Sequence, residues 1–265
     1  MSSPTALREP ASVLAFDTST EWLAAAVQHA GTGVTLRAEG GAAASATLLP
    51  QLHGLLARAA CTLADIDAIA FGRGPGAFTG LRTACAVAQG LGLGLGRPLV
   101  PVDSLLIVAE DALVQAADLA DADAGAVVGV VMDARMDEAY AALYRWRAGT
   151  WQVLQPPALY SLPALAQAWA GQAPQLLAGS ALAAFGERLP LPAARRLPTE
   201  QDRPGALLRL ALRAVRAGEG IDAASALPLY LRDKVAFTTA EREARRLLPG
   251  GTQHAGRAVA PQGAA

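Results

Sequence analysis

The sequence is poor in the residues on which many protein chemistries depend. It has two cysteines and three histidines among 265 residues. Cys61 and Cys85 fall where a helix end and a helix interior are expected, so a disulfide framework is implausible and a reduced cytosol is the simpler setting. His29, His53 and His254 form neither H-x-x-x-H nor H-E-x-x-H. Local spacing therefore assembles no metal site.

Long apolar runs and an excess of basic charge are also missing. No run approaches the ~20 apolar residues that span a bilayer, and residues 1–10 lack the apolar core of a secretory signal, so we expect a cytoplasmic protein without membrane contact. The formal net charge is −1. A protein that holds nucleic acid unaided usually shows a basic face, whereas the arginines here are scattered. Any RNA would be held mainly by another subunit.

The hydrophobic pattern alternates between strands and helices. Apolar runs of strand length predict strands at 13–16, 66–71, 99–102, 127–132 and 176–178, and glycine-bearing turns predict hairpins at 23–39 and 138–154. Helical spacing predicts helices at 42–60, 79–95, from 103 or 104 to 119, 161–170, 180–188 and 204–217. This alternation indicates an α/β protein with mixed sheets.

The second half repeats the order of the first: an apolar strand, an aspartate (Asp17, then Asp133), a polar turn and a hairpin. We therefore expect two lobes, at 12–120 and 121–232, joined by an acidic, alanine-rich link at 118–125. The ends, 1–11 and 233–265, are expected to be disordered because the last segment is charged and then rich in Gly, Gln and Ala.

The most distinctive segment is a glycine-rich run between a strand and a helix. It reads Gly72-Arg73-Gly74-Pro75-Gly76-Ala77-Phe78-Thr79-Gly80, with Arg82 close by. Glycines let backbone amides approach a ligand, and a helix start adds partial positive charge, so one interpretation is an anion-binding turn. The other is a crossover whose glycines permit close packing. The run matches neither G-x-x-x-x-G-K-[ST] nor G-x-G-x-x-G.

A second candidate is the turn Asp17-Thr18-Ser19-Thr20. An aspartate after a buried strand, followed by three hydroxyls, could hold a metal-bound phosphate with Asp133 across a cleft. An Asx or Ser/Thr turn that enters a hairpin explains the same residues. His53, near the apolar face of its helix, is interpreted as a packing residue.

The two helices of the first half each carry an apolar face. Its members are Leu48, Leu52 and Leu55 on the first helix and Ala84, Val87, Ala88, Leu91 and Leu95 on the second. Packing within the fold is one explanation for the small residues on the second helix. The other is that the two helices form an exposed apolar pair that awaits a partner.

Together these residues resemble the TsaB (YeaZ-type) family, within the actin-like ATPase superfold. The motifs that carry the resemblance run from 13 to 232: V-L-A-F-D-T-S-T at 13–20, T-L-L-P at 47–50, D-A-I-A-F-G-R-G-P-G-A-F-T-G-L-R at 67–82, A-Q-G-L at 88–91, D-A-R at 133–135 and Y-L-R at 230–232.

The resemblance implies a fold of two actin-like lobes and a role without an active site of its own. It implies that the chain binds TsaD directly through the two helices and, with TsaE, supports threonylcarbamoyl transfer to N6 of adenosine 37 in tRNAs that read codons beginning with A. It also implies a homodimer when the chain is alone, contact with tRNA only through the complex, and no required cofactor, with ATP or ADP bound weakly or at a partner interface.

One departure from the family pattern affects the expected interface. Many relatives carry E-H-[ST] before the Leu-Pro of the first helix, where this chain has Ala43-Ala44-Ser45. A polar contact is lost there, so we expect a more apolar partner surface.

Two enzyme hypotheses stay open at this point. One is an ATP-hydrolysing or kinase-like member of the superfold, in which Asp17 and Asp133 hold Mg-phosphate. The other is a peptidase, which has little support because no metal-ligand pair and no G-x-S-x-G elbow is present.

Overall fold

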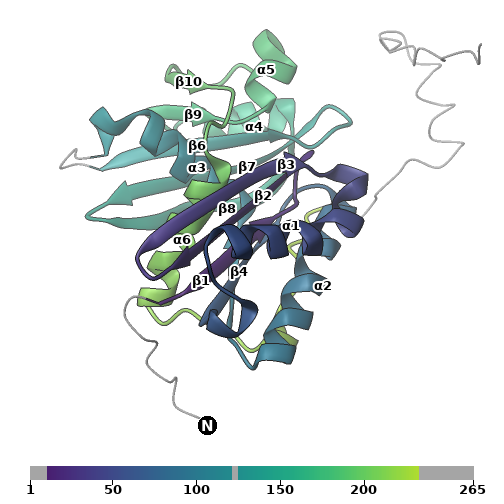
Figure 1. Ribbon diagram of the computed structural model, residues 1–265. Helices are drawn as coiled ribbons and strands as arrows, with labels where there is room; N and C mark the ends of the chain where they lie inside the picture. The colour runs from purple at the N-terminus through teal and green to yellow at the C-terminus, as the bar shows by residue number, and fades with distance from the viewer. Residues whose placement is uncertain (1–10, 121–124, 233–265) are drawn as a thin grey trace, which may run out of the picture. The chain divides into compact units, whose positions relative to one another are not determined.

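The computed structural model describes residues 11–120 and 125–232, and two five-stranded sheets form its framework (Figure 1). The elements of the first half are β1 (Val13–Asp17), β2 (Trp22–His29), β3 (Thr32–Glu39), α1 (Ala44–Arg58), β4 (Ala68–Gly74), α2 (Phe78–Leu95), β5 (Leu99–Asp103) and α3 (Ser104–Gln115). Those of the second half are β6 (Ala126–Asp133), β7 (Glu138–Arg147), β8 (Thr150–Ser161), α4 (Leu162–Trp169), β9 (Leu176–Ala178), α5 (Ala181–Phe185), β10 (Arg195–Leu197) and α6 (Arg203–Arg216).

The two sheets share one topology. Their strand orders are β3-β2-β1-β4-β5 and β10-β9-β6-β7-β8, so β6 to β10 repeat the arrangement of β1 to β5. In each sheet the first three strands pair antiparallel, and the last two add in parallel. Asp17 and Asp133 end the corresponding strands β1 and β6. The predicted mixed α/β sheets and the repeated order are confirmed.

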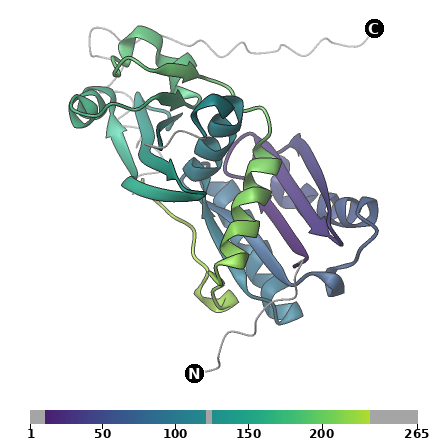
Figure 2. The ribbon, with the colours of Figure 1, turned by 90° about the vertical axis from the view of Figure 1, so that its left-hand side faces the viewer.

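The first sheet is covered on both faces because its strands alternate between two cores. Leu14 and Phe16 of β1 pack with α1 and α2. Val13 and Ala15, which point the opposite way, pack with α6. Figure 2 shows α6, in green, along this sheet on the side away from α1.

The second sheet is also enclosed between helices. Val128 and Val130 of β6 pack against α3. Val131 of the same strand packs on the other face with α4 and α5, where Trp169 is fully buried.

Helices α3 and α6 each pack on the sheet of the other half of the chain, although the sequence predicts a lobe boundary at residue 120. Helix α3 belongs to the first half of the chain but packs on the second sheet, whereas α6 follows the second sheet and packs on the first. The two helices lie side by side at the seam between the sheets (Figures 1 and 2). A division of the chain at a single residue therefore does not describe the packing, because each sheet is covered in part by a helix from the other half of the chain.

Several boundaries differ from the sequence expectations. Strand β4 starts at Ala68 and continues into the glycine run to Gly74, and α3 ends at Gln115, ahead of a short 3₁₀ turn. Strand β10 was not predicted, and Ala11, expected in a disordered end, is buried. The expected disorder at 1–10 and 233–265 and half of the expected link (121–124) lie outside the described residues. Within the described ranges no helix is both long and apolar enough to cross a membrane.

Candidate functional site

The glycine run packs directly on the Asp17 turn. A Cβ atom on Gly72 would overlap the carboxylate of Asp17, and one on Gly80 would overlap the carbonyl oxygen of Thr18. The hydroxyl of Thr18 also donates a 2.7 Å hydrogen bond to the carbonyl oxygen of Gly80. This close approach supports the close-packing interpretation of the run, since the side chain of any other residue at Gly72 or Gly80 would push the two segments apart.

The two arginines that could serve an anion at this run are engaged within the chain. The Nε of Arg73 lies 2.6 Å from Oδ1 of Asp103. The guanidinium of Arg82 lies 3.9 Å from the ring centroid of Phe78 and donates to the hydroxyl of Tyr230 at 3.1 Å. The run thus joins β4 to α2, and the side chains of Arg73 and Arg82 contact other side chains of this chain.

The Asp17 carboxylate is buried, and both of its oxygens accept hydrogen bonds. Oδ1 accepts hydrogen bonds from the amide and the hydroxyl of Ser19, at 2.9 and 2.7 Å, and Oδ2 accepts one from the hydroxyl of Ser104 at 2.8 Å. Burial by itself raises the pKa of Asp17, but the charge of Arg203 and these hydrogen bonds outweigh it, so the pKa lies below its ordinary value. Asp17 is therefore a buried anion.

Its counter-ion is Arg203, the first residue of α6. The Nε and Nη2 atoms of Arg203 each lie 3.3 Å from Oδ1 of Asp17, and Nη1 lies 2.6 Å from Oε2 of Glu200. Burial opposes the charge of Arg203, yet the two carboxylates raise its pKa above the ordinary value. Burial raises the pKa of Glu200, and Arg203 offsets that only in part.

The other predicted phosphate-binding residues make local contacts. Asp133 accepts a hydrogen bond from the amide of Arg135 at 2.8 Å and pairs with its guanidinium at 3.3 Å. The hydroxyl of Thr20 accepts from the amide of Trp22 at 3.1 Å, as in a hairpin turn. Within the described part of the chain, no group of three or more His, Cys, Asp or Glu side chains is placed to hold a metal ion.

Most of the side chains that the sequence assigned to a partner surface are buried in this chain's own core. They are Leu48, Leu52, Leu55, Ala84 and Ala88, each at most 2% exposed. The expectation that these five face a partner is corrected, because the first sheet covers the same apolar faces of α1 and α2. Val87, Leu91 and Leu95 are partly buried at the rim of that core.

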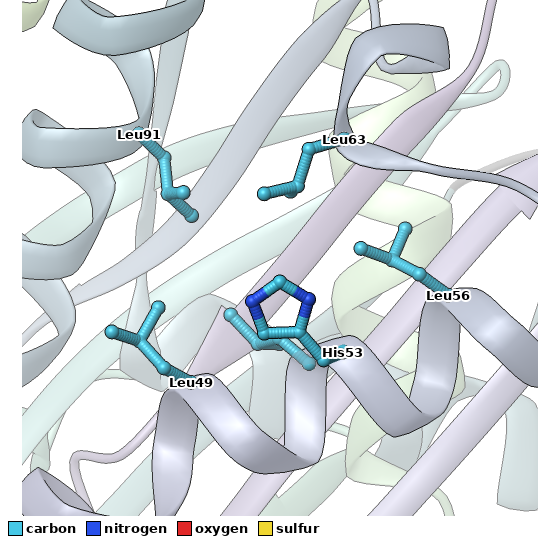
Figure 3. Close-up of a pocket in the computed structure, with 6 residues that line it drawn as sticks. Leu49, His53, Leu56, Leu63 and Leu91 are labelled. Carbon is cyan, nitrogen blue, oxygen red and sulfur yellow. The ribbon is translucent and has the colours of Figure 1, made fainter.

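Between α1 and α2 lies a shallow pocket that opens on the surface. Leu49 and His53 of α1, Leu63 and Leu91 line it together with Leu52 and Leu56, and the labelled side chains converge on it from three segments (Figure 3). Leu49 is 45% exposed, and His53 is exposed rather than packed, which corrects its expected role. The accessible part of the helix pair is thus the outer rim of its apolar face.

A segment after α6 returns to the glycine run and α2. The amide of Leu229 donates to the carbonyl oxygen of Arg73 at 2.7 Å, and the carbonyl oxygen of Ala226 accepts from the side chain of Gln89 at 2.9 Å. The ring of Tyr230 lies 5.1 Å from that of Phe78. The motif at 230–232 therefore includes an anchor for the start of α2, which its residue types alone did not indicate.

Sequence reasoning missed Arg203, Glu200 and Ser104 at the Asp17 turn. Asp202 and Pro204 do mark a helix start, and Asp202 caps α6 through the amide of Gly205. No local pattern, however, pairs Arg203 with a carboxylate 186 residues away.

Comparison with known proteins agrees with this architecture. A family model described as "TsaD: tRNA N6-adenosine threonylcarbamoyltransferase" matches residues 39–239. The tRNA threonylcarbamoyladenosine biosynthesis protein TsaB of Escherichia coli is 31% identical over 239 residues, which cover 85% of this chain and 96% of that protein. TsaB of Haemophilus influenzae is 36% identical over 128 residues, so there the match spans 48% of this chain and about half (51%) of the relative.

A solved structure supports the same assignment. YeaZ from Pseudomonas aeruginosa superimposes with a TM-score of 0.74 at 35% identity, covering 83% of this chain and 100% of that one. The fold, the near-complete alignment with E. coli TsaB and the family-model match agree with the sequence resemblance. The chain therefore belongs to the family that this model describes and, within it, to the TsaB (YeaZ-type) group.

Proposed function

We propose that this chain is a non-catalytic subunit in the formation of threonylcarbamoyladenosine at position 37 of tRNA. The relatives from E. coli and H. influenzae are both named tRNA threonylcarbamoyladenosine biosynthesis protein TsaB. In this role the chain binds TsaD through α1 and α2 and, together with TsaE, supports transfer of the threonylcarbamoyl group by TsaD. It acts in the cytoplasm and meets tRNA through the complex.

The observation that carries the proposal is the pocket between α1 and α2. Its rim presents Leu49 and Leu91 beside the exposed His53, and the helices beneath are fixed on the first sheet by buried leucines. A helix pair that is held on its own sheet and exposes apolar side chains suits an apolar contact with a partner, because a few well-packed residues supply most of the binding energy at many interfaces. Ala43 and Ala44 leave the first residue of α1 and the residue before it without a polar side chain, and Ser45 follows them.

The state of the Asp17 turn supports an accessory role over an ATPase or kinase role. An enzyme of that kind would need Asp17 available to a metal-bound phosphate. Here the carboxylate already accepts from Ser19 and Ser104 and is paired with Arg203. In the absence of TsaD we propose that the same helix pair mediates a homodimer, and that any ATP or ADP binds weakly or at a partner interface.

Reconstitution tests this function. TsaD, TsaE, tRNA and the threonylcarbamoyl-adenylate donor are incubated with and without this chain, and modified adenosine is quantified after nuclease digestion. We expect turnover to rise strongly when the chain is added to the complete mixture. When the chain replaces TsaD, we expect no modified adenosine to form. Turnover that does not depend on this chain would refute the proposal.

A further inference from the structure

The strongest unassigned feature is the buried charge cluster at the seam of α3 and α6. Arg203 at the start of α6 has a side chain only 5% exposed, and that of Asp17 at the end of β1 is fully buried. Ser104, the first residue of α3, contacts both: its hydroxyl donates to Asp17, and its carbonyl oxygen accepts from Nη2 of Arg203 at 3.5 Å. The guanidinium of Arg203 therefore joins α6 to the end of β1 and to the start of α3.

This cluster has no room for an additional cation. Nη2 of Arg203 also donates to the hydroxyl of Ser19 at 3.0 Å, while Nη1 is held by Glu200. The remaining side of the Asp17 carboxylate faces Gly72, where even a methyl group does not fit. A metal-bound phosphate could reach Asp17 only after Arg203 had left, and a buried carboxylate without a counter-ion is strongly disfavoured.

We propose that Arg203 is a built-in cation that occupies the position a metal-bound phosphate would need at the end of β1, and that it holds α6, α3 and the Asp17 turn in one arrangement. In this arrangement the chain's own guanidinium supplies the charge that an exchangeable ligand would otherwise bring. The position of α6 on the first sheet then requires no nucleotide. The inference concerns the isolated chain, and it does not depend on partner binding.

The primary test is a double-mutant cycle on the full chain, with thermal unfolding as the measurement. Arg203→Met leaves Asp17 buried without its cation, so we expect the unfolding midpoint to fall by about 6–20 °C. Adding Asp17→Asn removes the charge that needed the cation, and the double variant should recover more than half of that loss. Arg216→Ala, an exposed arginine on the same helix, is the control and should leave the midpoint within about 2 °C.

Each alternative result is decisive. The cycle also includes Asp17→Asn alone. If the fall in the midpoint of the double variant equals the sum of the falls in Arg203→Met and Asp17→Asn, Arg203 acts by packing and the proposal is overturned. If Arg203→Met does not fold, a folded Asp17→Asn/Arg203→Met variant supports the proposal, and an unfolded one overturns it.

Two further measurements examine whether Arg203 positions α3 and α6 and whether it excludes a metal-bound phosphate from Asp17. Hydrogen exchange of Arg203→Met, or of the double variant where the single one does not fold, should show faster exchange at the starts of α3 and α6 than in wild type, with no change in Arg216→Ala. Unchanged exchange there would contradict the positioning role.

Calorimetric titration of wild type with Mg-ATP should show no saturable binding that depends on Asp17. Saturable binding abolished by Asp17→Asn would refute the occupied-site account.

Discussion

Gly72 and Asp17 are in such close contact that a methyl group on the glycine would occupy the space of the carboxylate. One residue belongs to the glycine run and the other to the first polar turn, so the two most distinctive segments of the sequence form a single packed unit. The glycines therefore serve backbone packing, and the aspartate serves an internal ion pair.

This contact predicts that Gly72→Ala is severely destabilising. Asp17 cannot move aside without losing its bonds to Ser19 and Ser104, so we expect overpacking and a broken buried network to cost about 3 kcal/mol or more of unfolding free energy. Urea denaturation measures this loss. Gly90→Ala is the matched control, because Gly90 lies in α2 and a Cβ atom added there would enter open space. This change should stabilise the chain by up to about 1 kcal/mol. Equal effects of the two changes would contradict the packing account.

The lowered pKa of Asp17 predicts a specific pH dependence of stability. A carboxylate whose pKa is lower in the folded than in the unfolded state stabilises the fold above its unfolded pKa, about 3.9, and this contribution is lost as pH falls through the folded pKa. The difference in unfolding free energy between wild type and Asp17→Asn should thus be constant from pH 7 to about 4 and shrink below it. Urea midpoints from pH 7 to 3 measure it. A difference that closes already above pH 5 would show a raised rather than a lowered pKa.

The Tyr230 anchor predicts that the segment at 226–231 can be loosened without unfolding the sheets. Tyr230→Ala removes the ring contact with Phe78 and the hydrogen bond from Arg82, contacts worth about 0.5–1.5 kcal/mol for a ring pair. The amide of Leu229, which donates to Arg73, should then exchange roughly 2- to 10-fold faster. Tyr230→Phe keeps the ring and should show a smaller change. If both variants exchange like wild type, Tyr230 does not anchor the segment.

Much of the fold was predictable because its signals are local. Apolar strands such as β1 and β6 end in aspartate, and glycine-bearing turns such as Gly31 mark the hairpins. Strand β10 was missed because its three residues are Arg195, Arg196 and Leu197, with no apolar pattern. It forms only by adding to β9 at the edge of the sheet.

The candidate site was less predictable because its partners are distant in sequence. Helical periodicity identified an apolar face on α1 correctly, but periodicity does not say what covers the face, and the first sheet covers Leu52 and Leu55. The pairing of Asp17 with Arg203 likewise depends on α6 crossing back from the second sheet. Neither relationship leaves a pattern within one segment.

The proposed partner surface predicts that mutations at the pocket rim separate binding from folding. Leu49→Glu and His53→Glu change exposed side chains on α1, so both variants should fold like wild type. Leu52 and Ala88 are unsuitable probes because a glutamate there would enter the core. Val153→Glu is the control, since Val153 is 55% exposed on β8 in the second sheet, away from both helices. Circular dichroism and the urea midpoint confirm that each variant is folded.

The most direct measurement of the central claim is the affinity of TsaD for these folded variants, determined by calorimetry or surface plasmon resonance. We predict that Leu49→Glu weakens binding at least about tenfold, because it places a charge in an apolar contact, whereas Val153→Glu binds like wild type. Wild-type affinity of both Leu49→Glu and His53→Glu, with the reconstituted activity also unchanged, would show that the helix pair is not the partner surface.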